Sequence, residues 1–384
     1  MLKRANRVTL SMSALAIAAL LFLDFASFQP NRILPGEGVP LLDALSLQWS
    51  LPVFGGALII ALLSWRPNRH AYHAILLMAT AIVALLPLLA GVFGLERATE
   101  GMRHGRAALG SGFWLAGFFT ALIMIEACHK LQAGIWLKLA GVTAVVAGIA
   151  IAYSFGVLEK LSLAQEFHVR QRQFVTEMGA HFNLVFWSML PSALMGMALA
   201  IWATRSEKAR RGLFGVLNVL QTIPSLALFG LLIAPLSYLA NEFEWLRAIG
   251  VQGIGFTPAL IALIGYSLLP MTRNAYVALT GTPEPVLDAA RGMGMSESQV
   301  FLQVRLPLAA PVILEGLRIM TVQTIGLTAV AALIGAGGMG TFIFQGLGQA
   351  AMDLVLLGAI PTILFALAAD ALFAFLTATA RGAP

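Results

Sequence analysis

The chain has 384 residues, of which 59% are hydrophobic and 11% charged, and its mean hydropathy is +0.85. Water-soluble globular proteins rarely reach these values, so the composition indicates an integral membrane protein. The net charge of +6 does not indicate nucleic-acid binding, because basic residues of membrane proteins usually mark cytoplasmic loops.

Ten apolar segments are long enough to be membrane-spanning helices, since a helix needs about 20 residues to cross about 30 Å of hydrocarbon. Lipid cannot satisfy backbone polar groups, so such runs form helices rather than strands. We therefore expect an all-α polytopic fold. The expected spans cover approximately residues 8–27, 47–65, 72–94, 108–128, 135–156, 181–203, 212–236, 256–279, 309–334 and 352–377.

The first expected span follows Lys3, Arg4 and Arg7. No convincing small-x-small cleavage site follows it, so we interpret it as a retained helix with its N-terminus inside the cell. The polar stretch of residues 158–180 separates two groups of five spans, and we expect it to be an external linker. The chain then has an N-terminal membrane region, residues 1–157, and a C-terminal membrane domain, residues 181–384.

A long loop, residues 280–308, joins the eighth and ninth expected spans on the cytoplasmic side. After Pro283, Val286, Leu287 and Ala290 share one face of a predicted short helix. Glycines at 292 and 294 then break that helix.

A second helix is predicted to start at Ser296, because Ser296 and Gln299 have the spacing of a capping box. It continues through Val304 until Pro307 interrupts it. The loop is therefore expected to form a helix, a glycine turn and a helix at the membrane surface.

This loop resembles the EAA loop of permease subunits in ATP-binding-cassette importers, whose pattern is E-A-A-x3-G-x9-I-x-L-P. Asp replaces Glu and Val replaces Ile in this chain. The matching residues are Asp288, Ala289, Ala290, Gly294, Val304, Leu306 and Pro307. The resemblance implies that the first helix fits a groove on a separate ATPase subunit and transmits its closure to the membrane helices. Asp288 then either contacts the ATPase through its charge or favours the helix N-terminus.

Other segments of the C-terminal half are similar to permeases of glycine betaine, choline and carnitine importers. They are NVLQTIPSLALFGLL (218–232), PALIALIGYSLLPMTRNAY (258–276), TIGLTAVAALIGAGGMGTFIFQGL (324–347) and GAIPTILFALAAD (358–370). The similarity covers about residues 181–377. The extra N-terminal helices make the chain most like the larger permease of low-affinity osmoprotectant uptake systems in bacterial inner membranes.

That resemblance implies a transport subunit rather than an enzyme, with a C-terminal five-helix permease core in the bilayer. Its partners would be two ATPase subunits, a second like or related permease and an external substrate-binding protein. No cofactor is expected on this chain, and ATP would be used by the ATPase subunit. Nucleic acid is not expected as a partner.

Polar residues on otherwise apolar helices are candidates for the substrate pathway. They are Asn218, Gln221, Thr222, Ser225, Tyr266 and Gln323. Residues of this kind also form hydrogen bonds between helices, and the sequence leaves both roles open. Glu315 and Arg318, three positions apart and near a predicted cytoplasmic end, are expected to be a structural ion pair.

Two other functions have less support from the sequence. The stretch IGAGGMG, residues 334–340, contains G-x-G-x-x-G but follows a spanning helix rather than a strand, so we do not expect dinucleotide binding. We expect a helix end with flexible backbone there, or an external loop near the exit of the pathway. An ion-coupled secondary transporter of a small solute is the alternative function, although ionisable residues are absent from the predicted midplanes of the C-terminal helices.

Overall fold

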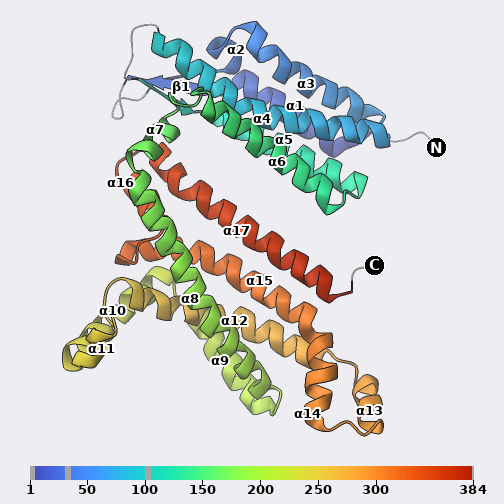
Figure 1. Ribbon diagram of the computed structural model, residues 1–384, viewed down its shortest axis with the longest axis vertical. Helices are drawn as coiled ribbons and strands as arrows, with labels where there is room; N and C mark the ends of the chain where they lie inside the picture. The colour runs from blue at the N-terminus through green and yellow to red at the C-terminus, as the bar shows by residue number, and fades with distance from the viewer. Residues whose placement is uncertain (1–4, 31–35, 100–104, 383–384) are drawn as a thin grey trace. The chain divides into compact units, whose positions relative to one another are not determined.

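The computed structural model describes residues 5–30, 36–99 and 105–382, and these residues are mainly helical (Figure 1). Lys3 and Arg4 lie outside them. Within the described residues, eight helices are long and apolar enough to cross a membrane. The expectation of an all-α polytopic fold is therefore confirmed. The chain divides into two compact units, Met1–Val169 and Arg170–Pro384.

The N-terminal unit is a bundle in which the long helix α4 packs against α3, α5 and α6, while α1 packs against α3 and α5. Its helices are α1 (Arg7–Phe22), α2 (Leu41–Ala44), α3 (Leu47–Trp65), α4 (Arg69–Thr99), α5 (Ser111–Leu131), α6 (Ile135–Ser154) and α7 (Ser162–Val169). Side chains such as Ile75, Phe93 and Ile123 are almost fully buried in its core.

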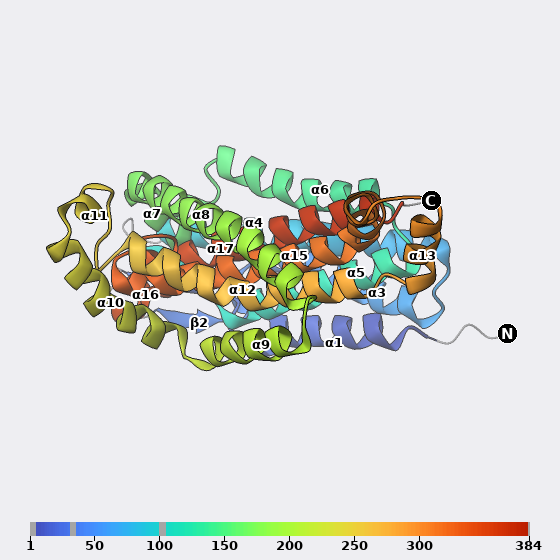
Figure 2. The same cartoon turned by 90° about the horizontal axis from the view of Figure 1, so that it is seen from below.

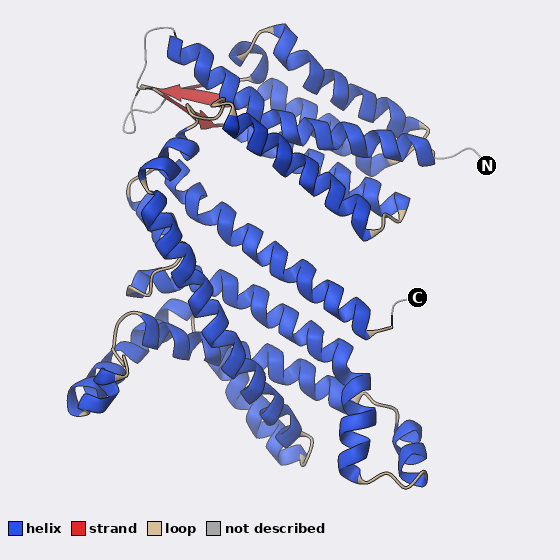
Figure 3. Cartoon of the chain, viewed as in Figure 1, coloured by secondary structure: helices blue, strands red, loops and turns tan. Residues whose placement is uncertain are grey.

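A small antiparallel sheet, absent from our expectations, closes one end of this bundle (Figure 3). Its strands are β1 (Ala26–Gln29), β2 (Glu37–Val39) and β3 (Arg106–Leu109), in the order β2-β1-β3. Ala26 pairs with both Val39 and Leu109. The expected spans 8–27 and 108–128 are therefore wrong at the ends that meet the sheet. A short apolar strand continuing an apolar helix carries no periodicity that separates the two.

The C-terminal unit is built around α12, which packs against both α8 and α15, and α15 also packs against α17 (Figure 1). A hydrogen bond of 2.9 Å between the buried hydroxyls of Ser267 and Thr324 joins α12 to α15. Helices of this unit include α8 (Gln171–Ala203), α12 (Phe256–Thr280), α15 (Leu306–Ala331), α16 (Gly340–Gly348) and α17 (Met352–Ala380). Residues 158–180, the expected linker, contain α7 and the first turns of α8.

The seventh expected span, 212–236, is wrong, because two separate helices occupy it (Figure 2). Helix α9 (Glu207–Thr222) ends before Ile223, and α10 (Ser225–Glu242) begins after Pro224. Ile223 has an extended backbone, with ψ 127°, as the ring of a following proline favours. A short helix, α11 (Glu244–Ala248), follows α10.

The expected interruption at Pro307 is also wrong. Helix α14 (Glu297–Gln299) runs through a π-helical segment, η1 (Val300–Arg305), directly into α15. The N–H of Leu306 donates to the carbonyl of Phe301, five residues earlier. This wider turn accommodates Pro307, which lacks an N–H and crowds a normal α-helical turn. Residues Glu297–Ile334 therefore form one continuous helix.

Gly340, at the start of α16, is predicted to tolerate no side chain. A Cβ built there would lie 1.8 Å from the backbone oxygen of Ala329, whereas a Cβ at Gly348 would meet no atom within 4 Å. We expect Gly340→Ala to lower the free energy of unfolding by about 1–3 kcal/mol through overpacking. Thermal unfolding of the purified protein measures this, with Gly348→Ala as the control. Equal melting temperatures for the two variants would contradict the packing seen here.

Candidate functional site

The EAA loop, residues 280–308, lies at the ends of α12 and α15 and folds as the expected helix, turn and helix (Figure 1). Its first helix is α13 (Glu284–Gly292), with Pro285 in the first turn. The second begins at Ser296, whose expected capping box is confirmed: the Ser296 N–H donates to Gln299 Oε1 at 2.8 Å, and the Gln299 N–H donates to Ser296 Oγ at 3.4 Å.

A small apolar core joins the two helices of the EAA loop. Leu287 and Ala290 of α13 are 1% and 2% exposed and pack with Val300, and the partly buried Met295 and Val304 cover them. The expectation that Val286 shares this face is wrong, since its side chain is 40% exposed. Positions 286 and 287 are separated by about 100° around a helix, so this narrow contact covers only one of them.

The motif residues consequently face different surroundings. Ala290 is turned inward, whereas Asp288 and Ala289 are exposed on the outer side of α13. Leu306 and Pro307 form the first turn of α15. The exposed surface of α13 therefore includes positions 288 and 289 but not 290.

Gly294 ends α13 through a left-handed backbone conformation, with φ +86°. Its N–H donates to the Arg291 carbonyl at 2.9 Å, and the N–H of Met295 donates to the Ala290 carbonyl at 3.3 Å. This pair of hydrogen bonds is the Schellman arrangement, which satisfies carbonyls at the end of a helix and favours glycine at the left-handed position. Gly292, by contrast, belongs to the helix.

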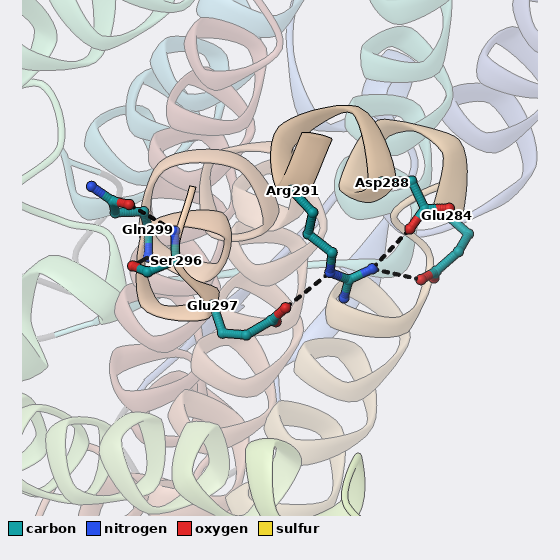
Figure 4. Close-up of polar contacts among 6 residues, drawn as sticks. All are labelled: Glu284, Asp288, Arg291, Ser296, Glu297 and Gln299. Atoms are coloured by element: carbon teal, nitrogen blue, oxygen red, sulfur yellow. Dashed lines mark hydrogen bonds and ion pairs between the residues drawn. The ribbon is translucent and has the colours of Figure 1, made fainter. Parts of the chain in front are cut away.

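Three carboxylates surround Arg291 and tie the two helices together (Figure 4). Its Nη1 lies 3.1 Å from Glu284 Oε1 and 3.0 Å from Asp288 Oδ1, and its Nε lies 2.9 Å from Glu297 Oε1. We call these four residues the Arg291 clasp. The Glu297 carboxylate, then those of Glu284 and Asp288, raise the pKa of Arg291 above its ordinary value, so the Arg291 guanidinium stays charged at every physiological pH.

The clasp gives Asp288 a role that the sequence analysis did not consider, as a partner of Arg291 within the loop. The spacing of Asp288 and Arg291, three positions apart, was a signal for that pair. Glu297 lies across the glycine turn from Arg291, so helical periodicity carried no signal for their contact.

Two of the pathway candidates meet at the break between α9 and α10. Gln221 Nε2 donates to the backbone oxygen of Tyr266 at 2.8 Å, and the Tyr266 hydroxyl donates to the backbone oxygen of Ile223. Tyr266 is nearly buried on α12. These reciprocal hydrogen bonds hold the interrupted backbone against α12.

The other four candidates are more dispersed. Asn218 Oδ1 accepts a hydrogen bond of 3.4 Å from Arg273 Nη2, and the exposed Thr222 hydroxyl donates to the Val219 carbonyl of its own helix. Ser225 opens α10 and Gln323 lies on α15, both partly buried. The structure therefore brings Gln221 and Tyr266 together and does not gather all six into one site.

The stretch IGAGGMG begins at the last residue of a 3-10 turn, η2 (Ala332–Ile334), and is a helix end as expected. Gly335, Gly337 and Gly338 have positive φ angles. Glu177 Oε2 of α8 accepts hydrogen bonds from the Gly338 N–H at 2.7 Å and the Thr341 hydroxyl at 3.2 Å. The backbone is thus held by contacts, rather than left without partners.

His181, also on α8, is fully buried, and its Nδ1 accepts a hydrogen bond of 3.3 Å from the N–H of Met339. Local sequence patterns carry no signal for Glu177 and His181, because about 160 residues separate them from the stretch that they contact.

The expected ion pair of Glu315 and Arg318 is confirmed, at 3.2 Å. Asp370 of α17 adds a second partner, since its two carboxylate oxygens lie 2.6 and 2.8 Å from Arg318 Nε and Nη2. This two-point contact joins α15 to α17.

Comparison with known proteins places both units in a transport context. Residues 5–164 match the family described as ABC transporter permease YehY, N-terminal domain. Residues 185–382 match the family described as Binding-protein-dependent transport system inner membrane component.

Similar proteins cover about half of the chain. The carnitine transport permease protein OpuCB of Listeria monocytogenes is 36% identical over 205 residues, which are 51% of this chain and 87% of that protein. The choline transport system permease protein OpuBB of Bacillus subtilis is 33% identical over 50% of this chain and 80% of that protein. The osmoprotectant import permease protein OsmW of Salmonella typhimurium is 35% identical over 50% of this chain and 83% of that protein.

Loss of the Arg291 clasp is predicted to loosen the EAA loop. Arg291→Gln removes the cation shared by three carboxylates, so we expect faster amide hydrogen exchange across residues 284–299. High salt should produce part of the same effect in the unaltered protein, because the clasp is exposed. The control is Arg211→Gln, which removes an exposed contact with Glu207 on α9. Unchanged exchange across residues 284–299 would contradict the role of the clasp.

Tyr266→Phe is predicted to weaken the contact between α12 and the break at Ile223. It removes one hydrogen bond and leaves the Ile223 carbonyl without that donor, at a cost of about 1 kcal/mol in stability. Hydrogen exchange at residues 221–227 and thermal unfolding measure the effect. Tyr238→Phe, at a position on α10 that is 63% exposed, is the matched control. The assignment is wrong if both variants behave alike.

Proposed function

Since the chain belongs to the family of binding-protein-dependent transport system inner membrane components, we propose that it is the permease of an ATP-driven importer for osmoprotectants such as glycine betaine. It is a multi-pass membrane protein and a transport subunit; ATP hydrolysis belongs to a separate subunit. The observation that carries the substrate class is the similarity of about half of the chain to permeases named for carnitine, choline and osmoprotectants.

In this proposal, closure of the ATPase subunits displaces the EAA loop. The exposed face of α13, with Asp288 and Ala289, contacts a groove on that subunit. The buried side, with Leu287 and Ala290, and the Arg291 clasp hold α13 to the following helix. Because Glu297–Ile334 is one continuous helix, displacement of the loop passes directly into α15. Val304, Leu306 and Pro307 lie at the start of that path.

The substrate pathway in this proposal runs past the break between α9 and α10. A helix interrupted within a membrane frees backbone polar groups, and these are tolerated where they contact protein or line a hydrated path. Tyr266 contacts the break directly and Gln221 bonds to the Tyr266 backbone. Asn218, Thr222 and Ser225 lie near the break in the sequence. Gln323 extends the candidate surface onto α15. Such a path selects weakly, so recognition of a quaternary ammonium group is left to the external binding protein.

The assembly that we propose contains two ATPase subunits, a second like or related permease and an external substrate-binding protein, in a bacterial inner membrane. This chain binds no cofactor in the cycle, and ATP is bound by the ATPase subunits. The family description, which names both binding-protein dependence and the inner membrane, supports this arrangement. It does not favour the ion-coupled secondary transporter, in which uptake would proceed without ATPase partners.

Substitution of Gly294 tests the coupling role. Gly294→Val places a branched side chain at φ +86°, at a cost of about 1–3 kcal/mol in backbone strain. No atom lies within 4 Å of the added Cβ, so the effect comes from the backbone rather than from crowding. We expect the variant to reach the membrane and its ATP-dependent uptake of labelled glycine betaine to fall by about tenfold.

Gly292→Ala is the control, because Gly292 is helical and a Cβ there also meets no atom within 4 Å. It should transport like the unaltered protein. Normal uptake by Gly294→Val would remove the coupling role. Competition by choline and carnitine in the same vesicles tests the substrate class, and uptake driven by an ion gradient without ATPase would replace the proposal with the secondary transporter.

A further inference from the structure

A cavity of about 460 Å³ opens within the N-terminal unit, outside the permease domain discussed above. The connection between α3 and α4 and the first turn of α4 form one wall, through Asn68, Arg69 and Tyr72. The end of α5 and the residue after it form the other, through Lys130 and Gln132. Pro67 and Leu131 complete the lining. The size suits a small ligand or a lipid headgroup.

The polar groups around this cavity are mainly hydrogen-bond donors. Arg69 has no ion pair or side-chain hydrogen bond among the described residues, so its guanidinium is available. The Tyr72 hydroxyl accepts a hydrogen bond of 3.0 Å from the Asn6 amide, which leaves its own proton to donate. Asn68 Oδ1 is already used, since it accepts from the Ala71 N–H at 2.7 Å.

One carboxylate, that of Glu126, lies near the cavity but outside its lining. Glu126 Oε1 lies 3.5 Å from Lys130 Nζ and accepts a hydrogen bond of 3.0 Å from the Asn6 amide. Lys130 is still 44% exposed, so it retains donors for another partner. None of the seven lining residues carries a carboxylate.

The position of the cavity at a helix end also favours an anionic ligand. The cavity lies at the N-terminus of α4, a helix of 31 residues, where the helix dipole and free N–H groups favour an anion. Two cations, a hydroxyl and an amide arranged around one space match an anion with several acceptor oxygens. A phosphate group meets this description, since its oxygens accept hydrogen bonds in several directions.

We infer that this cavity binds a phosphate group, carried by an anionic phospholipid or present as free phosphate. The cavity lies at the ends of α4 and α5, which are both long and apolar enough to span a membrane. Basic pockets at such helix ends are suited to lipid headgroups. The inference does not depend on the proposed transport function.

The test compares phosphatidylglycerol with phosphatidylcholine on the purified full-length chain. Native mass spectrometry is expected to show that the unaltered protein retains phosphatidylglycerol about tenfold better. The double variant Arg69→Gln, Lys130→Gln should lose this preference. Arg66→Gln, which removes a nearby cation outside the lining, should keep it.

A second variant adds a negative charge without removing a donor cation. Gln132→Glu places a carboxylate on the cavity wall and should also abolish the preference. Thermal unfolding with inorganic phosphate distinguishes the source: stabilisation that the double variant loses assigns the site to free phosphate, and an effect of phosphatidylglycerol alone assigns it to lipid. The inference is overturned if neither anion binds the unaltered protein, or if the double variant and Gln132→Glu bind like it.

Discussion

The continuity of the helix from Glu297 to Ile334 is the constraint on which the C-terminal unit depends. It contains 38 residues, which correspond to about 57 Å of α-helix. Two prolines, Pro307 and Pro311, lie within it, and the π-helical segment η1 absorbs the missing N–H of the first. The EAA loop begins at one end of this helix and the glycine stretch follows the other. The α15 part of this helix packs against α8, α12 and α17.

Different interactions hold the two ends of this long helix. At the EAA loop, the Arg291 clasp is exposed, and its strength depends on ionic conditions. At the glycine stretch, His181 is fully buried and its hydrogen bond to Met339 is shielded from water. The first end is therefore sensitive to ionic strength, whereas the second is held by a contact that water does not reach.

Most of the spans could be predicted from apolar runs, because length and hydropathy are properties of a single segment. Helix α3, for example, has the limits expected from the sequence. Whether a proline interrupts a helix could not be predicted in the same way. Pro191 and Pro270 lie inside continuous helices, whereas Pro224 separates two. The difference lies in tertiary contacts, because the Tyr266 hydroxyl donates a hydrogen bond to the freed Ile223 carbonyl. Contacts of this kind, like the pairing of β1 with β3, join residues far apart in sequence, and local patterns do not contain them.

The two-point contact of Arg318 with Asp370 has a mechanical consequence for α17. A bidentate guanidinium–carboxylate pair fixes orientation as well as separation, so α15 and α17 resist both sliding and twisting past one another at this point. Helix α16 packs along α17, where Gly358 leaves no room for a side chain because a Cβ there would lie 2.5 Å from the Met339 oxygen. A displacement of α15 would therefore be shared with α17 through this ion pair and with α16 through its packing on α17.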